Sequence, residues 1–284
     1  MAQVGPIGIL TTTFPASSSA SFESILDSIA AHALGEVQFD LSCAGLPSMP
    51  DAVDPAAADR IRAALAVRGI DMAALSGTFN MIHPDPAVRD DGLRRLDVLA
   101  AACARLGTQV ITLCSGTRDT TSMWRRHPDN DTPEAWRDLL DVMGRAVRIA
   151  DEHNVTLAFE PEVNNAADSA RKARALIDAI GSPRLKVVMD GANIFHTGEL
   201  PRMREILTEA FELLGDHIAL AHAKDLDHDG DAGHLPAGHG LLDYGLYINL
   251  LKQSSYAGPL VLHGLRPDQI DGCAAFLRTQ LGDA

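Results

Sequence analysis

Cysteine is scarce in this sequence of 284 residues. Its four cysteines are scattered, and no two of them form a CxxC pair. This excludes a disulfide-bonded scaffold and a cysteine-rich zinc module, and it fits a reducing compartment. The N-terminal residues also lack the basic segment and the long apolar run of a secretory signal. We therefore expect a cytoplasmic protein.

Positive charge and long apolar runs are lacking as well. Lysine and arginine together number 24, against 38 aspartates and glutamates, so the formal net charge is −14. A chain this acidic argues against a nucleic-acid partner and against binding to an anionic membrane surface. No run approaches the ~18 consecutive apolar residues that a transmembrane helix needs. We therefore expect no membrane span.

The remaining composition is that of an ordinary globular protein. Apolar residues make up 46% of the chain and charged residues 22%, which excludes wholesale disorder. No linker or low-complexity segment divides the chain, and its length allows one large domain. We expect a single domain over residues 1–284.

Two patterns alternate along the chain. Short runs rich in Val, Ile and Leu predict strands, and longer stretches with apolar residues three and four apart predict amphipathic helices. The expected strands are residues 4–10, 36–41, 70–76, 109–114, 155–160, 186–190, 218–222 and 259–263. The expected helices are residues 21–34, 55–68, 88–106, 133–153, 166–180, 201–214, 244–254 and 267–281.

The ends of several expected helices carry capping signals. Asp54 precedes Pro55, and Thr132 precedes Pro133, so a capping side chain stands before proline at the first helical position. At the other end, a glycine in the left-handed conformation commonly stops a helix. Four glycines are expected in that role: Gly69, Gly107, Gly181 and Gly215.

Eight strand–helix units predict the architecture. Each unit has about 35 residues, the size of a helical crossover between parallel strands. Continuously apolar strands are typical of parallel sheets that are covered on both faces. The α/β fold that closes such a sheet is the (β/α)8 TIM barrel, normally ~250 residues long. An open doubly wound sheet is the alternative, but no GxGxxG follows the first strand.

Four consecutive expected strands end in a residue that can bind a metal ion. These residues are Glu160 in LAFEPEVNN, Asp190 in KVVMDGANIF, His222 in IALAHAKDL and His263 in GPLVLHGL. Because strand ends converge near the axis of a barrel, we expect the four side chains to hold one divalent ion. Two carboxylates and two imidazoles suit Zn²⁺, Mn²⁺, Fe²⁺ or Co²⁺, and Mg²⁺ stays open. Taken singly, Asp190 also fits a helix cap, and His263 also fits a hydrogen-bonded packing residue.

These strand ends resemble the xylose isomerase-like TIM barrels, the sugar isomerase/epimerase superfamily, over essentially the whole chain. The resemblance implies that Glu160, Asp190 and His222 bind one divalent metal ion. The chain departs from the family at two positions. Many members have Asp-x-x-His after the sixth strand, where this chain has Asn193, and the epimerases place Glu where this chain has His263. A ligated imidazole lacks the second oxygen that lets a carboxylate act as a base, so two-base epimerisation loses its partner from the eighth strand.

The expected activity is a metal-dependent isomerase or epimerase acting on a sugar or sugar derivative. The ion polarises the carbonyl and stabilises an ene-diolate, while Glu160 removes the proton alpha to the carbonyl. Glu162, Lys224 and His83 are candidates for the second proton transfer. The candidate substrate-binding residues are Asn80, His83, Arg118, Asn193 and Lys224. Asn80 equally fits a residue that only satisfies the backbone of a turn.

Other functions remain open. A metal-dependent carbon–oxygen lyase or dehydratase would act on a keto-sugar or an inositol-type substrate. A DNA-repair phosphodiesterase is opposed by Asn193 and by the net charge of −14. A non-catalytic sugar-binding barrel is the last alternative. The expected partner is a small carbohydrate, without nucleic acid or membrane, and a homo-oligomer stays open. The long segment 115–132 fits either a lid over the site or a surface loop.

Overall fold

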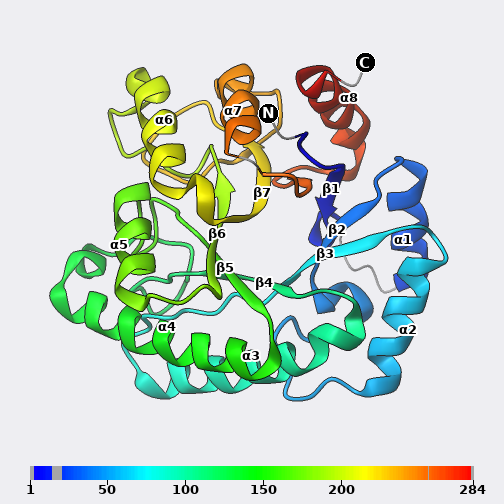
Figure 1. Cartoon of the computed structure of the whole chain (residues 1–284), viewed down its shortest axis with the longest axis horizontal. Coiled ribbons are helices and arrows are strands. Elements are labelled where there is room, and N and C mark those ends of the chain that lie inside the picture. Colours follow the sequence, from blue (N-terminus) through cyan, green and yellow to red (C-terminus); the bar gives the residue numbers. More distant parts are fainter. Residues whose placement is uncertain (1–2, 15–20, 255, 283–284) are drawn as a thin grey trace.

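The computed structural model describes residues 3–14, 21–254 and 256–282. Within these residues, eight parallel strands form a closed ring (Figure 1). They are β1 (Ile7–Leu10), β2 (Glu36–Phe39), β3 (Asp71–Ser76), β4 (Val110–Cys114), β5 (Thr156–Glu160), β6 (Leu185–Asp190), β7 (Ile218–Asp225) and β9 (Leu260–Leu262). Each pairs with its neighbour, and β9 pairs with both β7 and β1, which closes the ring.

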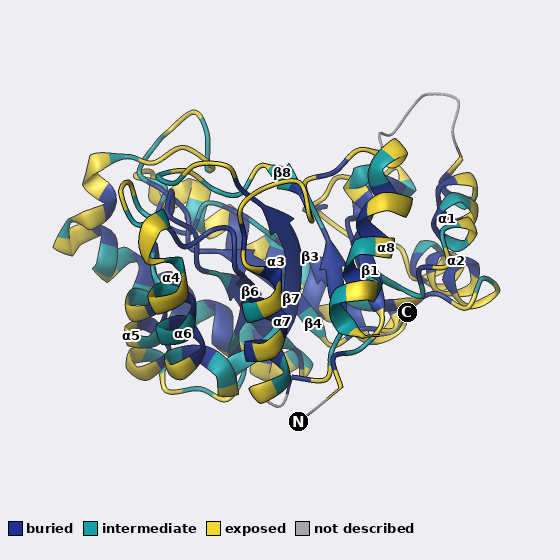
Figure 2. Ribbon diagram, turned by 90° about the horizontal axis from the view of Figure 1, so that it is seen from above, coloured by how far each residue is buried: buried dark blue, intermediate teal, exposed yellow. Residues whose placement is uncertain are grey.

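Helices surround this ring. They are α1 (Phe22–Ala31), α2 (Pro55–Ala66), α3 (Pro86–Leu106), α4 (Pro133–His153), α5 (Ala170–Ile180), α6 (Met203–Leu214), α7 (Tyr244–Gln253) and α8 (Ile270–Leu281). Figure 2 shows the strands as the buried interior, while the helices expose their outer faces. The TIM barrel is confirmed, and the open doubly wound sheet is excluded because β1 and β9 are hydrogen-bonded to each other.

The alternation of side chains across each strand decides which residues point into the barrel. Outward residues pack under the helices. On β2, for example, the ring of Phe39 lies edge-on to that of Phe22 on α1, with centroids 5.9 Å apart. Inward residues form a second, smaller apolar cluster: Leu10, Ala74, Ala158, Val188, Leu220 and Val261. The inward residues nearer the carboxyl ends of the strands lie directly above this apolar layer.

Most capping signals are confirmed. Asp54 accepts a hydrogen bond from the amide of Ala56 at the start of α2, and Thr132 accepts one from Ala135 at the start of α4. Gly69, Gly107 and Gly181 have positive φ angles of 64°, 95° and 65°.

Several helix ends differ from the expectation, and three of them have a clear local cause. The prediction for Gly215 was wrong, because its φ is −54° and the chain continues into a 3-10 turn, Gly215–His217. Helix α3 begins at Pro86, two residues early, because Asp85 caps it through the amide of Ala87. Helix α5 begins only at Ala170, where Ser169 caps it.

A short antiparallel hairpin extends one strand beyond the expected end. Strand β8 (Leu235–Pro236) pairs with Lys224 and Asp225, so β7 runs three residues past His222. The buried carboxylate of Asp225 accepts hydrogen bonds from backbone amides of the following loop: Leu226, Gly238 and Leu242. The expectation that the strand ends at His222 was therefore wrong, and Lys224 belongs to β7.

The lengths and compositions of the helices can be compared with those of a membrane span. Among the residues that the structure describes, no helix combines the length and the apolar character that are needed to cross a bilayer.

Glu36 provides a test of the register between β2 and β3. It lies opposite Asp71, and burial together with this second carboxylate raises the pKa of Glu36 to about 7. A raised pKa means that the fold favours the protonated acid. The resulting stability is present below the ordinary pKa of 4.5 and is lost as the pH rises through 7.

We therefore expect Glu36→Gln to raise the melting temperature at pH 8. The gain in unfolding free energy is about 1–2 kcal/mol once solvent screening of this half-buried group is included. The gain should shrink toward zero near pH 4.5, as measured by thermal unfolding across that pH range. The control is Glu152→Gln, which removes an exposed carboxylate from α4. A Glu36→Gln effect that does not change with pH would contradict the raised pKa of Glu36.

Candidate metal centre and active site

Polar side chains stand directly above the inward apolar layer at the ends of neighbouring strands. Two residues beyond Ala158, Val188, Leu220 and Val261 come Glu160, Asp190, His222 and His263, respectively. Because side chains alternate, all four share the inward face of their strands, and so does Lys224 on the extension of β7. His263 follows the last residue of β9 rather than ending that strand.

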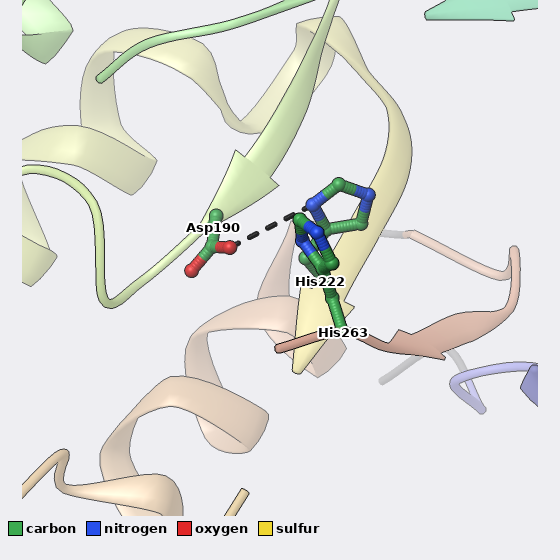
Figure 3. Close-up of side chains that lie close together, drawn as sticks. All are labelled: Asp190, His222 and His263. Carbon is green, nitrogen blue, oxygen red and sulfur yellow. Dashed lines mark ion pairs between the residues drawn. The ribbon is translucent and has the colours of Figure 1, made fainter. Parts of the chain in front are cut away.

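The structure brings three of these side chains together as a group of potential ligands. One ligand atom each from Asp190, His222 and His263 lies within 4.8 Å of the other two. Figure 3 shows the three side chains turned toward one another, with Nδ1 of His222 3.6 Å from Oδ2 of Asp190. Glu160 lies outside this set of three but borders it, since its Oε1 is 3.3 Å from Nδ1 of His222. The Nζ of Lys224 lies 3.4 Å from Oδ2 of Asp190.

Two atoms of this cluster indicate that a ligand belongs between them. Oδ2 of Asp190 and Nδ1 of His263 are buried, and neither has a hydrogen-bond partner among the described residues. Buried polar atoms are nearly always hydrogen-bonded, so two such atoms without a partner in one cluster need an explanation. Carboxylate oxygen and imidazole nitrogen are donors that first-row divalent ions accept. The residues therefore fit a divalent metal ion.

The charges in the cluster depend on one another. Burial opposes ionisation of Asp190, but the positive charges of Lys224 and His222 outweigh it and hold the pKa of this carboxyl well below its usual range. Burial also opposes a charged His222, yet Glu160 and Asp190 raise the pKa of its imidazole to about 9. The pKa of Lys224 is raised as well, since the surrounding carboxylates outweigh burial. Cationic side chains thus balance the buried carboxylates.

Two further groups favour their neutral forms. Burial, together with the charges of Lys224 and His222, lowers the pKa of His263 well below its usual value. Its imidazole is therefore neutral at physiological pH, which is the form that binds metal. Burial and the charge of Glu160 raise the pKa of Glu162 to about 8. The carboxyl of Glu162 consequently keeps its proton at neutral pH.

Asn193 fixes the position of Glu160. Its side-chain Nδ2 donates to Oε1 of Glu160 at 2.5 Å, and its Oδ1 accepts from the backbone amide of Gly233 at 2.8 Å. Both ends of this buried amide are thus occupied by the protein, and the loop after β7 is tied to Glu160. Its expected contact with a sugar hydroxyl stays a prediction.

Three other expected substrate-binding residues make hydrogen bonds and ion pairs away from the cluster. Asn80 accepts from the amide of Thr117, and its Nδ2 donates to the carbonyl of Asp119. Arg118 donates to the carbonyl of Ile82 and pairs with the carboxylate of Asp138. The Nδ1 of His83 accepts from the amide of Asp85. The plainer interpretation of Asn80, a residue that satisfies turn backbone, agrees with these contacts.

Gln38 on β2 is a polar neighbour of the cluster that sequence reasoning missed. Its Oε1 lies 2.7 Å from Nε2 of His222, on the opposite side of the ring from the carboxylates. The available signal was a single polar residue at an inward position of an apolar strand. Tyr247 on α7 was also missed; its hydroxyl donates to the carbonyls of Met189 and His222 and so links β6 to β7.

The sequence matches known proteins over most of its length. Residues 29–280 match the family described as xylose isomerase-like TIM barrel. The L-ribulose-5-phosphate 3-epimerase UlaE of Shigella flexneri serotype 5b (strain 8401) is 27% identical over 184 residues, which are 65% of this chain and 60% of that protein. The match therefore spans about three fifths of the length of this curated relative.

Solved structures share the fold along nearly the whole chain. An L-ribulose 3-epimerase superposes with a TM-score of 0.75 at 17% sequence identity, covering 99% of this chain and 95% of that one. The IOLI protein, solved with a bound zinc atom, gives a TM-score of 0.71 at 14% identity over 98% and 97% of the two chains. At these identities, the structural likeness establishes the fold.

The cluster predicts how metal binding responds to loss of one charged ligand. Wild-type protein loaded with Zn²⁺ or Mn²⁺ should retain about one ion per chain, as expected for a single site with four ligands. Asp190→Asn keeps the shape of the side chain but removes its charge. Losing this interaction costs roughly 3 kcal/mol or more, which weakens binding by about 100-fold.

Elemental analysis and competition with a chelator measure both quantities. The control is Asp178→Asn, which removes an exposed carboxylate from α5 and should leave the metal affinity unchanged. Equal ion retention by Asp190→Asn and the wild type would place the metal elsewhere.

Proposed function

The chain belongs to the xylose isomerase-like TIM barrel family, and from this premise we propose that it is a divalent-metal-dependent sugar epimerase or isomerase. The ligands of the ion would be Glu160, Asp190, His222 and His263. The observation that carries the proposal is the pair of orphaned ligand atoms, Oδ2 of Asp190 and Nδ1 of His263, inside this cluster. Their position at the carboxyl ends of the strands is where TIM barrels carry out catalysis.

Each residue of the cluster has a distinct part in the proposed reaction. A divalent ion held there would supply Lewis-acid polarisation of a sugar carbonyl and its neighbouring hydroxyl. Glu160 would remove the proton from the carbon next to that carbonyl, because Asn193 holds its carboxylate in a fixed orientation at the site. The ammonium of Lys224, which is buried beside Asp190, would stabilise negative charge developing on the substrate.

The return of the proton requires an acid, and Glu162 suits this role. Its carboxyl is buried and accepts a hydrogen bond from Nδ2 of Asn165 at 3.3 Å. With a pKa raised to about 8, it carries a proton at neutral pH. In the proposed reaction, Glu160 would therefore remove one proton from the substrate, and the neighbouring Glu162 would donate the other.

The relatives suggest the class of substrate. The curated relative described above acts on L-ribulose 5-phosphate, and one of the solved structures is an L-ribulose 3-epimerase. We therefore propose a ketose or its phosphate as the substrate.

A carbon–oxygen lyase is the second candidate, and His263 favours it. Its imidazole sits in the ligand cluster at the end of β9, so this strand supplies no carboxylate that could act as a second base. Elimination of a beta leaving group needs only one base, Glu160, together with an acid for the leaving oxygen. A keto-sugar or inositol-type substrate would suit that reaction.

Solvent deuterium exchange tests the proposal. Metal-loaded protein incubated with L-ribulose or its 5-phosphate in D2O should incorporate deuterium next to the carbonyl, as followed by NMR. Glu160→Gln should slow the exchange by about 100- to 10,000-fold, because general-base catalysis contributes factors of that size. Metal content is measured in the same samples, and Asp178→Asn serves as the control.

The products of this experiment separate the candidate functions. Deuterium in the substrate or its epimer supports the epimerase or isomerase. A dehydrated enone or diketone product supports the lyase instead. Exchange that persists unchanged in Glu160→Gln would contradict the role of Glu160. The absence of exchange with every ketose, despite a bound ion, would favour a sugar-binding barrel without catalysis.

A further inference from the structure

We propose that Gln38 is a positioning residue of the metal centre: it holds the imidazole of His222 so that Nδ1 presents its lone pair to the ion. The inference rests on the proposed function, because it takes His222 to be a ligand. Gln38 itself touches neither substrate nor metal in this scheme. It acts through the ring of His222.

Gln38 lies in the interior of the barrel. On β2, Val37 and Phe39 point outward and belong to the core beneath the helices. Gln38 between them therefore points inward, and only 5% of its surface is exposed. Its register partners on the two flanking strands are Leu10 and Ala74, both members of the inward apolar layer. A primary amide at such a place must find partners for its donors and its acceptor.

The partners of Gln38 determine how its amide is oriented. Its Nε2 donates to Oγ of Ser76 on β3 at 3.2 Å and to Oγ1 of Thr112 on β4 at 3.1 Å. These two hydroxyls use both amide hydrogens. The carbonyl end, Oε1, is consequently directed to the other side of the barrel, where it lies 2.7 Å from Nε2 of His222.

This orientation decides which nitrogen of His222 carries the ring proton. An amide oxygen can only accept, so the hydrogen bond requires a proton on Nε2. An ion at this site would replace one proton of His222, and the neutral imidazole that keeps its proton on Nε2 presents a free lone pair at Nδ1. Nδ1 is the nitrogen that faces Glu160 at 3.3 Å and Asp190 at 3.6 Å. Gln38 thus selects the tautomer whose lone pair points into the metal cluster.

The same contact restrains the ring itself. Metal-binding histidines commonly donate their second ring N–H to a carbonyl or a carboxylate, which fixes the ring and strengthens it as a ligand. The hydroxyl of Tyr247 additionally holds the backbone carbonyl of His222 at 3.0 Å. Side chain and backbone of His222 are therefore fixed by separate partners, Gln38 and Tyr247.

Two substitutions at Gln38 separate this role from simple space filling. Gln38→Met has a similar length but no acceptor for Nε2 of His222, and Gln38→Glu keeps an acceptor oxygen in the same place. Zinc affinity, measured by chelator competition, should fall by about 10- to 100-fold in Gln38→Met. Gln38→Glu should bind zinc at least as tightly as the wild type, because a carboxylate also accepts the ring proton.

A matched control tests the polar interior without touching His222. Thr112→Val removes one hydroxyl partner of Gln38 but leaves Ser76 and the contact with His222 in place. Its zinc affinity should stay close to that of the wild type. Melting temperatures of all variants show whether each one is folded.

NMR of zinc-loaded wild-type protein with ¹⁵N-labelled histidine gives a readout that needs no variant. It should find the proton of His222 on Nε2 and the metal on Nδ1. The opposite arrangement would overturn the proposal, and so would wild-type zinc affinity in folded Gln38→Met. Failure of the wild type to bind zinc would overturn both this inference and the proposed function. If only the role of Gln38 is wrong, the wild-type protein still binds zinc and still catalyses proton exchange in its substrate.

Discussion

The buried charge of Asp190 is the constraint on which the rest of the site depends. A carboxylate inside a barrel is stable only if positive charge and hydrogen bonds compensate it. Its Oδ1 accepts from the amide of Ala192 at 2.9 Å, and its Oδ2 faces the ammonium of Lys224 at 3.4 Å without a hydrogen bond. One oxygen is thus committed to the fold, while the other is left for a cation. In the absence of an ion, the buried carboxylates favour positive charge on Lys224 and His222, which stand on one face of β7.

Apolar packing around the cluster offsets the free-energy cost of burying its charged side chains. An apolar layer beneath the cluster and outward cores on every strand supply the burial energy that offsets the unfavourable groups above. The loop after β7 is held by the buried carboxylate of Asp225, and Tyr247 links β6 to β7 through their carbonyls. These contacts keep the strand ends rigid, which a preorganised metal site requires. In the proposed site, His263 is a neutral donor, so Glu160 and Asp190 alone bring negative charge to the ion.

Much of this arrangement could be predicted from the sequence, because it follows from periodicity. Apolar runs located the strands, and the residues that close those runs, Glu160 and Asp190, are the last residues of β5 and β6. The extension of β7 could not be predicted, since it depends on pairing with Leu235 and Pro236 across a loop that carries no strand pattern. The same holds for Gln38, whose partners come from three other strands. The direction of a loop side chain such as Arg118 is set by tertiary packing, which periodicity does not encode.

The proposed metal site holds one ion inside the barrel, between residues at the ends of four strands. Diffraction from crystals of the zinc-loaded protein, collected at the zinc absorption edge, tests it most directly. We expect one strong anomalous peak among Glu160, Asp190, His222 and His263, with Nδ1 of His222 about 2.0–2.1 Å from the ion. A peak found only at an exposed group, such as Asp227 with His228 and His234, and none inside the barrel would contradict it.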